Sequence, residues 1–248
     1  MSSPKLNINT SLFKLDAEQM VGKGYSGSSS PISIEKVTKE FNKLERINLS
    51  DDSHRRAIDE LFPSSLLHAR NDADWKLFSS MSRYDRCNRS FVAGCFNNEI
   101  LELKLISYKW RRKDGIKWKT RAGTSPNGTP FIRIFTDDSS IYVIEGHRDC
   151  LTAILLGLNF VMIPYAGFRL KDADALKKEV SGRKVVFIVE DIAAFNCMSR
   201  IASAIEATAS EIIMIQLKTG EKCDLSDYVF IKNNIKEVLD GLKNKELN

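Results

Sequence analysis

The sequence predicts an α/β protein, in which a four-stranded parallel sheet flanked by helices follows a small module of helices and a β-hairpin. Two observations carry this prediction. From residue 141 onward, apolar β-branched runs alternate with segments of helical periodicity, which is typical of a parallel sheet covered on both faces. Before that point, three helical patterns precede an alternating, strongly basic strand.

The composition is that of a soluble globular protein. The chain has 248 residues, of which 43% are hydrophobic and 28% are charged, enough to bury the core of one large domain or two small ones. No apolar run approaches the roughly 18 residues of a membrane-spanning helix, and the N-terminus lacks the apolar stretch of a signal peptide. We therefore expect a cytoplasmic protein. Five cysteines without CxxC spacing predict ordinary thiols.

The first third of the chain divides into a flexible segment and a helical module. Residues 1–31 are rich in Ser, Gly, Asn and Lys, which predicts a flexible lead-in. Ser33 is expected to cap a helix whose apolar residues continue to Ile47 at helical spacing. Further helices are predicted at about 51–62 and 72–81. We assign no chemistry to these helices, which with the hairpin form an expected module over 32–137.

A β-hairpin is predicted after these helices. Leucines alternate with charged residues over 101–105, and Asp114-Gly115 is a turn signal before a returning strand at 116–121. A short strand is expected at 131–135. Between residues 104 and 121 the chain has eight basic residues against one acid, although the net charge of the whole chain is only +5.

Aromatic residues are interleaved with these charges. Cations that follow phosphates and rings that stack on bases suit single-stranded nucleic acid, so we predict a single-stranded DNA surface here. The alternative is that the charges only guard an exposed strand against edge pairing, and that some of the tryptophans belong to the core. The candidate nucleic-acid-binding residues are Lys109, Trp110, Arg111, Arg112, Lys113, Lys117, Trp118, Lys119 and Arg121.

Strands and helices alternate over residues 138–248, the second expected domain. Gly157 is a candidate C-cap of the first helix. The predicted strands lie at 141–144, 160–164, 185–189 and 211–217, and the predicted helices at 148–156, 171–180, 194–208 and about 231–242.

Acidic residues follow the first and third strands of the predicted sheet. Glu145 ends the first strand, and Glu190 with Asp191 ends the third. Ligands bind beyond the carboxyl ends of parallel strands, so these acids meet at one edge if the two strands are neighbours. Gathered carboxylates need a cation, and Mg²⁺ takes oxygen ligands while keeping waters for substrate phosphates.

The order strand, Glu-Gly-x-x-Asp, helix resembles the first motif of the Toprim family. Residues 142–165 (YVIEGHRDCLTAILLGLNFVMIPY) look closest to bacterial, phage and plasmid DNA primases and primase-helicases. Residues 220–228 (GEKCDLSDY) are similar to the Lys-Asp-x-x-Asp-Tyr stretch that follows the fold in such proteins. The resemblance covers roughly residues 100–230.

This resemblance implies a set of site residues and a cofactor. Glu145 would be the catalytic general acid/base and a metal ligand, with Mg²⁺ (or Mn²⁺) as the cofactor. Glu190 and Asp191 would be further metal ligands. Gly146 and Arg148 are candidate phosphate or nucleotide contacts, and the candidate accessory acids are Asp149, Asp224 and Asp227.

The second acidic motif departs from the family pattern. Toprim proteins carry Asp-x-Asp-x-x-Gly after the third strand, whereas residues 190–195 read Glu-Asp-Ile-Ala-Ala-Phe. In one register Ile192 and Phe195 replace the second Asp and the Gly, and in the other Ala193 replaces the second Asp. Either way one metal-ligating carboxylate is missing. This loss matters because two-metal chemistry needs precisely placed ligands.

Three functions remain open at this stage. The first is a primase that synthesises primers on single-stranded DNA by Mg²⁺-dependent nucleotidyl transfer from nucleoside triphosphates, with a replicative helicase or other replication protein as partner. The second is a catalytically inactive Toprim protein that binds nucleic acid or a replication partner as a scaffold. The third is a Toprim nuclease, which needs a fuller acidic cluster. The chain lacks GxxxxGK[ST], so we expect no ATPase activity.

Overall fold

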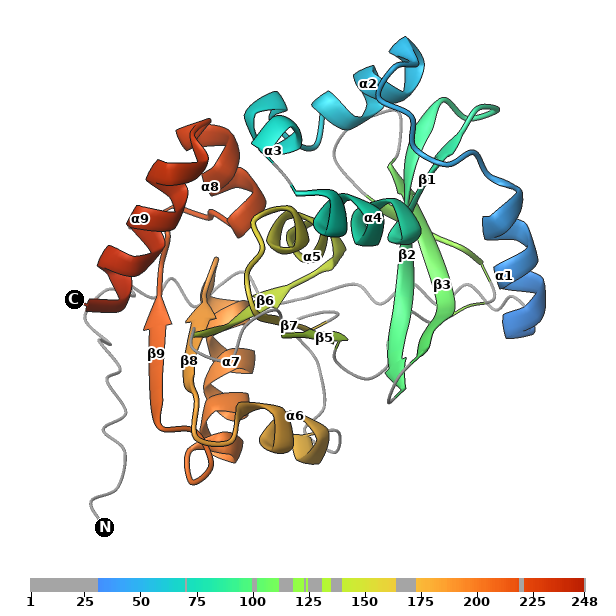
Figure 1. Cartoon of the computed structure of the whole chain (residues 1–248). Coiled ribbons are helices and arrows are strands. Elements are labelled where there is room, and N and C mark those ends of the chain that lie inside the picture. Colours follow the sequence, from blue (N-terminus) through green and yellow to red (C-terminus); the bar gives the residue numbers. More distant parts are fainter. Residues whose placement is uncertain are drawn as a thin grey trace.

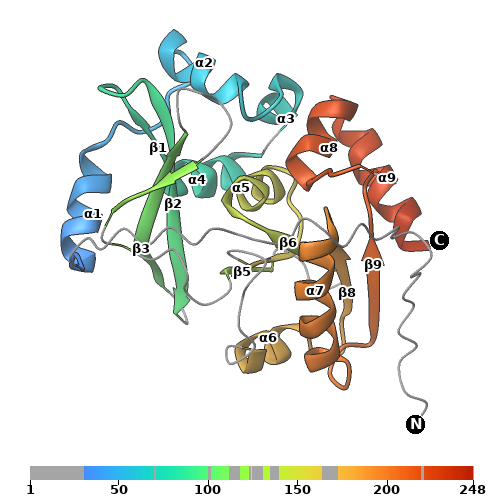
Figure 2. The same ribbon diagram turned by 180° about the vertical axis from the view of Figure 1, so that it is seen from behind.

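A computed structural model shows two sheets with helices around and between them (Figures 1 and 2). The N-terminal lead-in and the turn of the predicted hairpin lie outside the residues that it describes. The described residues are 31–69, 71–99, 102–111, 118–122, 124, 131–134, 140–163, 173–218 and 221–247.

Four helices open the described chain. They are α1 (Ile34–Lys43), α2 (Asp52–Asp59), α3 (Ser64–Ala69) and α4 (Asp72–Met81). As predicted, Ser33 caps α1, and its hydroxyl accepts a hydrogen bond from the backbone N–H of Lys36. The second helix ends earlier than predicted, and α3 was not predicted because six residues are too few to show a helical period.

The first sheet is antiparallel, with the order β1-β2-β3-β4. Its strands are β1 (Ser82–Asp85), β2 (Ser90–Glu99), β3 (Glu102–Arg111) and β4 (Trp118–Thr120). The pair β3–β4 confirms the predicted hairpin strands. No strand was predicted before residue 101, and β1 and β2 were missed because they contain too many polar and small residues to alternate clearly.

A register shift decides which side chains of β3 share a face. Cys95 pairs with Ser107 and Phe96 with Leu105, so Ile106 is an extra residue in β3. Leu105, Tyr108 and Trp110 consequently lie toward α1, where Leu105 is buried in a cluster with Val37 and Phe41 of that helix. Residues 107, 109 and 111 lie on the opposite face of the strand.

The second sheet has five strands in the order β5-β7-β6-β8-β9. They are β5 (Phe131–Arg133), β6 (Ile141–Glu145), β7 (Phe160–Ile163), β8 (Lys184–Ile188) and β9 (Glu211–Ile215). The four strands β6 to β9 pair in parallel, which confirms the predicted fold class. The short strand predicted at 131–135 is β5, which pairs antiparallel with β7 at the edge of this sheet.

Helices cover both faces of the second sheet. They are α5 (His147–Leu155), α6 (Ala173–Val180), α7 (Ile192–Ile205), α8 (Leu225–Lys232) and α9 (Ile235–Leu247). Helices α6 and α7 pack on one face, and α5, α8 and α9 pack on the other. The final helix predicted at about 231–242 is α9, which begins and ends a few residues later than predicted. Helix α8 was not predicted, and Asn233, with φ 46°, ends it before α9 begins. Gly157 follows α5 with φ 66°, as its predicted role at the helix end requires.

One apolar core joins the two sheets. It contains Phe78 of α4, Phe91 of β2, Leu151 of α5 and Ile144 of β6. Helix α5 therefore packs between the antiparallel and the parallel sheet (Figure 1). All five cysteines are free thiols, and only Cys87 is exposed. Within the described residues, no helix is both long and apolar enough to cross a membrane.

Candidate functional site

The carboxyl ends of β6 and β8 lie side by side. Val143 of β6 pairs in parallel with Phe187 of β8, so Glu145 and Glu190 reach the same edge of the sheet, as the sequence predicted. Gly146 follows Glu145 with φ +88°, a backbone conformation that favours glycine, and it precedes α5 without any side-chain cap. The backbone N–H groups that open α5 consequently donate no hydrogen bond to a capping side chain at Gly146.

A lysine from the segment before α8 contacts the acids at the end of β8. The Lys222 ammonium lies 3.3 Å from Glu190 Oε1 and 2.9 Å from Asp191 Oδ2. Asp191 also caps α7, because its Oδ1 accepts a hydrogen bond of 2.9 Å from the N–H of Ala194. Lys222 lies within residues 220–228, and the sequence predicted no role for it.

The pKa values of these groups follow from burial and from the lysine. Burial raises the pKa of Glu190, although Lys222 opposes this shift. Burial also opposes ionisation of Asp191, but the N–H of Ala194 and the Lys222 ammonium hold its pKa below the ordinary value. The two carboxylates in turn raise the pKa of Lys222, against the effect of burial. An internal cation thus neutralises part of the acidic edge.

The described residues at this edge do not fit a Mg²⁺ ion. Among them, no group of three or more His, Cys, Asp or Glu side chains is arranged to hold a metal. Of the predicted ligands, Glu190 and Asp191 are paired with the ammonium of Lys222. Phe195, at the position of the family's Gly, packs against the core between the sheet and α7. Asp224 is another described acid whose charge acts on Glu190, but its carboxylate caps α8.

Asp149 connects α5 to α8. Its Oδ2 accepts a hydrogen bond of 3.0 Å from the N–H of Leu225. Its Oδ1 accepts two more, of 2.9 Å from the N–H and 2.5 Å from the hydroxyl of Ser226. The side chain is buried, and this burial, together with the charge of Asp224, raises its pKa well above the ordinary value. These contacts make Asp149 an anchor for the first turn of α8.

The other two candidate accessory acids, Asp224 and Asp227, also make structural contacts at the start of α8. Asp224 caps the helix, because its Oδ1 accepts a hydrogen bond of 2.7 Å from the N–H of Asp227. Arg148 donates from Nη1 to Asp227 Oδ1 at 2.8 Å and from Nε to the carbonyl of Leu61 at 3.3 Å. The guanidinium of Arg148 also lies 5.5 Å from the ring of Phe230. Arg148 therefore holds three segments together, and its contact with a phosphate stays a prediction.

The inner face of β3 carries Lys109 toward the start of α5. His147, in the first turn of α5, is buried, and burial together with the charge of Lys109 lowers its pKa to about 3. His147 is thus a neutral core histidine. Trp118 of β4 pairs with Arg111 on this face and packs edge-on to Phe91, with 6.2 Å between ring centroids. The charge of Lys109 on β3 thus acts on the first turn of α5, the helix that follows the Glu145-Gly146 turn.

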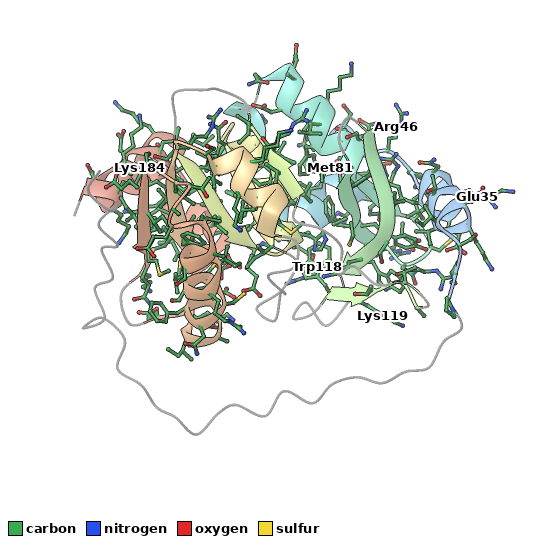
Figure 3. The ribbon with its side chains drawn as sticks, turned by 90° about the horizontal axis from the view of Figure 1, so that it is seen from below. Glu35, Arg46, Met81, Trp118, Lys119 and Lys184 are labelled. Carbon is green, nitrogen blue, oxygen red and sulfur yellow. The ribbon has the colours of Figure 1, made fainter. Side chains whose placement is uncertain are left out.

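The outer part of the hairpin contains Trp110 and Lys119. The Lys119 ammonium lies 5.5 Å from the centroid of the Trp110 ring, and Lys119 itself is exposed. Figure 3 shows Trp118 and Lys119 on β4, the edge strand of the first sheet. Arg121 is engaged elsewhere, because its Nε donates to Glu40 of α1 at 2.8 Å. The candidates Arg112, Lys113 and Lys117 lie outside the described residues.

Comparison with solved structures decides the fold. The structure of the DnaG primase catalytic domain bound to single-stranded DNA is similar, with TM-score 0.55, 11% identity and coverage of 85% of this chain and 80% of that chain. A primase domain from Pseudomonas aeruginosa has TM-score 0.52 at 12% identity and covers 86% of this chain and 78% of its own. The fold is that of the primase catalytic core.

Of the three comparisons with known proteins, only the one with solved structures finds similar proteins. No family model matches the sequence, and no curated protein matches it. The Escherichia coli primase catalytic core has TM-score 0.50 at 12% identity and covers 85% of this chain and 79% of its own. The Toprim segment recognised in the sequence corresponds to the second sheet and its helices.

Proposed function

We propose that the chain binds single-stranded DNA along β3 and β4 as a primase-like Toprim protein, and that the edge of its parallel sheet serves this binding without a divalent metal. The observation that carries the proposal is the position of Lys109. Its charge acts on His147 in the first turn of α5, so the basic strand is near the helix that follows the Glu145-Gly146 turn. In a structure of this fold, the DnaG primase catalytic domain is bound to single-stranded DNA.

The chemistry of this surface suits a single strand. Lys109 and Lys119 attract phosphates from the two faces of the hairpin, and the half-buried ring of Trp110 lies beside the ammonium of Lys119. The uncapped N–H groups at the start of α5 are further donors for a phosphate near Gly146. The acidic edge itself repels phosphates less than bare carboxylates would, because Lys222 neutralises part of it.

Equilibrium binding of a labelled single-stranded oligonucleotide tests this proposal. We expect Lys109→Ala and Lys119→Ala each to weaken binding several-fold to about tenfold, because each removes one phosphate contact. Lys236→Ala is the matched control, since Lys236 is an exposed lysine on α9. Equal affinities for all three variants would refute the proposed surface.

A second candidate is primer synthesis, which the convergence of Glu145 and Glu190 at neighbouring strand ends favours. In this case nucleoside triphosphates would be substrates, and a replicative helicase would be an expected partner in the cytoplasm. The test is incorporation of labelled ribonucleotides on single-stranded DNA with Mg²⁺ or Mn²⁺. Short products that disappear in Glu145→Gln would establish a primase, whereas DNA binding without products supports the non-catalytic protein.

A further inference from the structure

A cavity of about 750 Å³ lies between α2 and the turn that joins β1 to β2. The charged residues that line it are four arginines and one acid: Arg56 and Glu60 of α2, Arg86 and Arg89 of the turn, and Arg111 at the end of β3. The cavity is separate from the acidic edge of the parallel sheet, because neither Glu190 nor Lys222 lines it.

Two of the four arginines have no acidic partner in the described part of the chain. Arg56 is exposed, and its Nε donates to the backbone carbonyl of Asp52. Arg89 is exposed as well. Among the described residues, no carboxylate forms an ion pair with Arg56 or Arg89. The cavity therefore carries a surplus of positive charge, which a partner with negative groups would neutralise.

The backbone of Arg89 is held in a strained conformation. Its φ is 48°, in the left-handed region that residues other than Gly, Asn and Asp rarely adopt. Asn or Gly would form this turn at a lower cost in stability, yet the position carries an arginine that lines the cavity. Backbone strain of this kind is concentrated at binding sites, so it is a second sign that the Arg89 side chain has a ligand.

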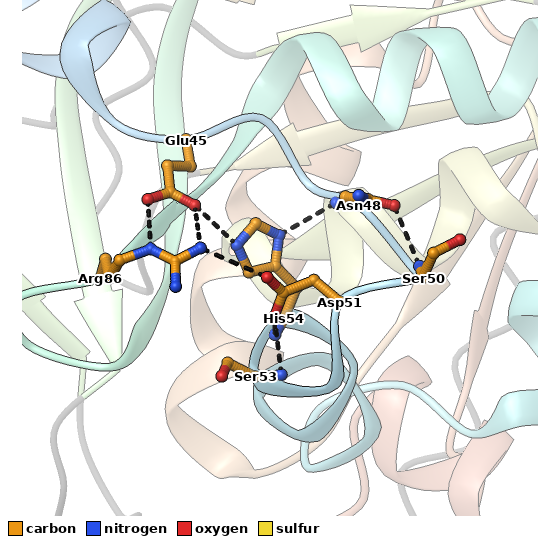
Figure 4. Close-up of polar contacts among 7 residues, drawn as sticks. All are labelled: Glu45, Asn48, Ser50, Asp51, Ser53, His54 and Arg86. Atoms are coloured by element: carbon orange, nitrogen blue, oxygen red, sulfur yellow. Dashed lines mark hydrogen bonds and ion pairs between the residues drawn. The ribbon is translucent and has the colours of Figure 1, made fainter.

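Arg86 shows how this lining binds carboxylates. Its Nε and Nη2 donate to the two oxygens of Glu45 at 2.5 and 2.8 Å, and Nη2 also lies 3.3 Å from Asp51 (Figure 4). The backbone N–H and carbonyl of Glu45 also bond to Tyr84 of the edge strand β1, at 3.1 and 2.8 Å. An acidic segment of this chain is thus already held beside the cavity by backbone hydrogen bonds and by one of the four arginines.

We propose that the cavity binds an acidic segment of a partner protein. Carboxylates of this segment would pair with Arg56 and Arg89 as Glu45 pairs with Arg86, because a planar guanidinium matches the two oxygens of a carboxylate. Recognition of acidic motifs by clusters of arginines is a recurring mode of peptide binding. The inference does not rest on the proposed function, since neither Lys109 nor Lys119 lines the cavity.

Two features favour a protein segment over nucleic acid, whose phosphates arginines also bind. Glu60 repels the regularly spaced charges of a phosphate strand, whereas a peptide can place a neutral or basic residue beside it. The aromatic residues of the lining, Tyr84 and Phe91, are buried, so neither ring is available to stack on a base. Single-stranded nucleic acid is normally bound with such stacking.

Fluorescence anisotropy of a labelled acidic peptide, titrated with the full chain, tests the site. The probe is a short peptide in which aspartates alternate with serines, and the control peptide has asparagine in place of each aspartate. We expect saturable binding of the probe that Arg56→Gln and Arg89→Asn each weaken about threefold to tenfold, as loss of a charge-assisted contact predicts. Asn tolerates the left-handed backbone at position 89, so this variant keeps the turn.

Arg200→Gln is the matched control variant. Arg200 of α7 is exposed, and its Nε donates to the carbonyl of the residue four positions earlier, as the Nε of Arg56 does. The inference is overturned if the wild type shows no saturable binding at millimolar concentration, or if the asparagine peptide binds as tightly as the probe. It is also overturned if the two arginine variants bind the probe as Arg200→Gln does.

Two further measurements separate this site from the proposed DNA surface. The double variant Lys109→Ala/Lys119→Ala should bind the probe like the wild type, and loss of binding there would place the peptide on the hairpin and overturn the inference. An unlabelled single-stranded oligonucleotide should displace the probe less effectively than the unlabelled peptide. More effective displacement, by an oligonucleotide whose own affinity falls in Arg56→Gln and Arg89→Asn, would assign the cavity to nucleic acid instead.

Discussion

At the end of β8, one ammonium group lies against two carboxylates. Two neighbouring acids at a sheet edge repel each other and favour protonation unless a positive charge is near. Lys222 supplies one unit of positive charge there, to Glu190 and Asp191. A divalent ion would supply more charge, but it would need a nearly octahedral set of oxygen ligands. Lys222 therefore neutralises part of the negative charge of Glu190 and Asp191 without a metal ion.

Without Lys222, Glu190 and Asp191 should bind a cation from solution more readily. We expect Lys222→Ala to lower the free energy of unfolding by about 1 kcal/mol at low ionic strength, a small loss because the lysine side chain is 64% exposed and screened by solvent. Millimolar Mg²⁺ should raise the melting temperature of the variant more than that of the wild type. Lys218→Ala, which removes a neighbouring exposed lysine, is the control. A variant that melts like the wild type and ignores Mg²⁺ would show that Lys222 is irrelevant to the acids.

At the scale of elements, α8 is attached to the second sheet through polar contacts with α5. Asp149 accepts three hydrogen bonds from Leu225 and Ser226, and Thr152 lies 3.0 Å from the hydroxyl of Ser226. Asp149 of the Glu-Gly-x-x-Asp turn therefore positions a helix that begins 76 residues later in the chain. Arg148, paired with Asp227, adds a second connection between the same two helices.

Substitution of Asp149 should detach α8. In Asp149→Asn, one of the two acceptor oxygens becomes an NH₂ group that faces N–H donors, and buried donors lose their partner. We expect the free energy of unfolding to fall by about 2–4 kcal/mol in chemical denaturation. Asp240→Asn, at an exposed position of α9, should change it by less than about 0.5 kcal/mol. Equal stabilities of the two variants would contradict the anchoring role.

The connection of α1 to the hairpin should depend on pH. The hydrogen bond from Arg121 lowers the pKa of Glu40 below its ordinary 4.5, although burial opposes the shift. Because the folded-state pKa is lowered, its stabilisation is fully present above the unfolded pKa and is lost as pH falls through the folded pKa. Glu40→Gln should therefore lower stability by about 0.5–1 kcal/mol at pH 7. In denaturation curves, the difference from the wild type should shrink as the pH falls below 4.5 and passes through the lowered pKa of Glu40; a difference that stays constant throughout the acid range would exclude Glu40 ionisation as its cause.

Periodicity was enough to predict the parallel strands and most helices, but contacts between distant residues were not accessible to it. The apolar runs of β6 to β9 are long and β-branched, whereas β1 and β2 mix polar and small residues. The edge acids were predicted from their positions after strands. The contact of Lys222 with them depends on how the segment before α8 returns to the sheet, which no local pattern encodes. For the same reason, the pairing of Arg121 with Glu40 was missed.

At the scale of the whole molecule, one apolar core holds the two sheets together. The inner face of β3 carries Lys109, whose charge acts on His147 of α5. The same core packs α5 between the sheets, so the basic strand and the edge of the parallel sheet are fixed relative to each other. The fold of the primase catalytic core thus presents a continuous basic strand next to an acidic edge that Lys222 partly neutralises.

The central claim is that this surface binds single-stranded DNA without a divalent metal. The most direct measurement is the affinity for a labelled single-stranded oligonucleotide as a function of salt concentration in EDTA. The wild type should bind, and the double variant Lys109→Ala/Lys119→Ala should reduce the slope of log affinity against log salt by about 1.4, because each lost phosphate contact contributes about 0.7. Absence of binding in EDTA, or an unchanged slope in the double variant, would contradict the claim.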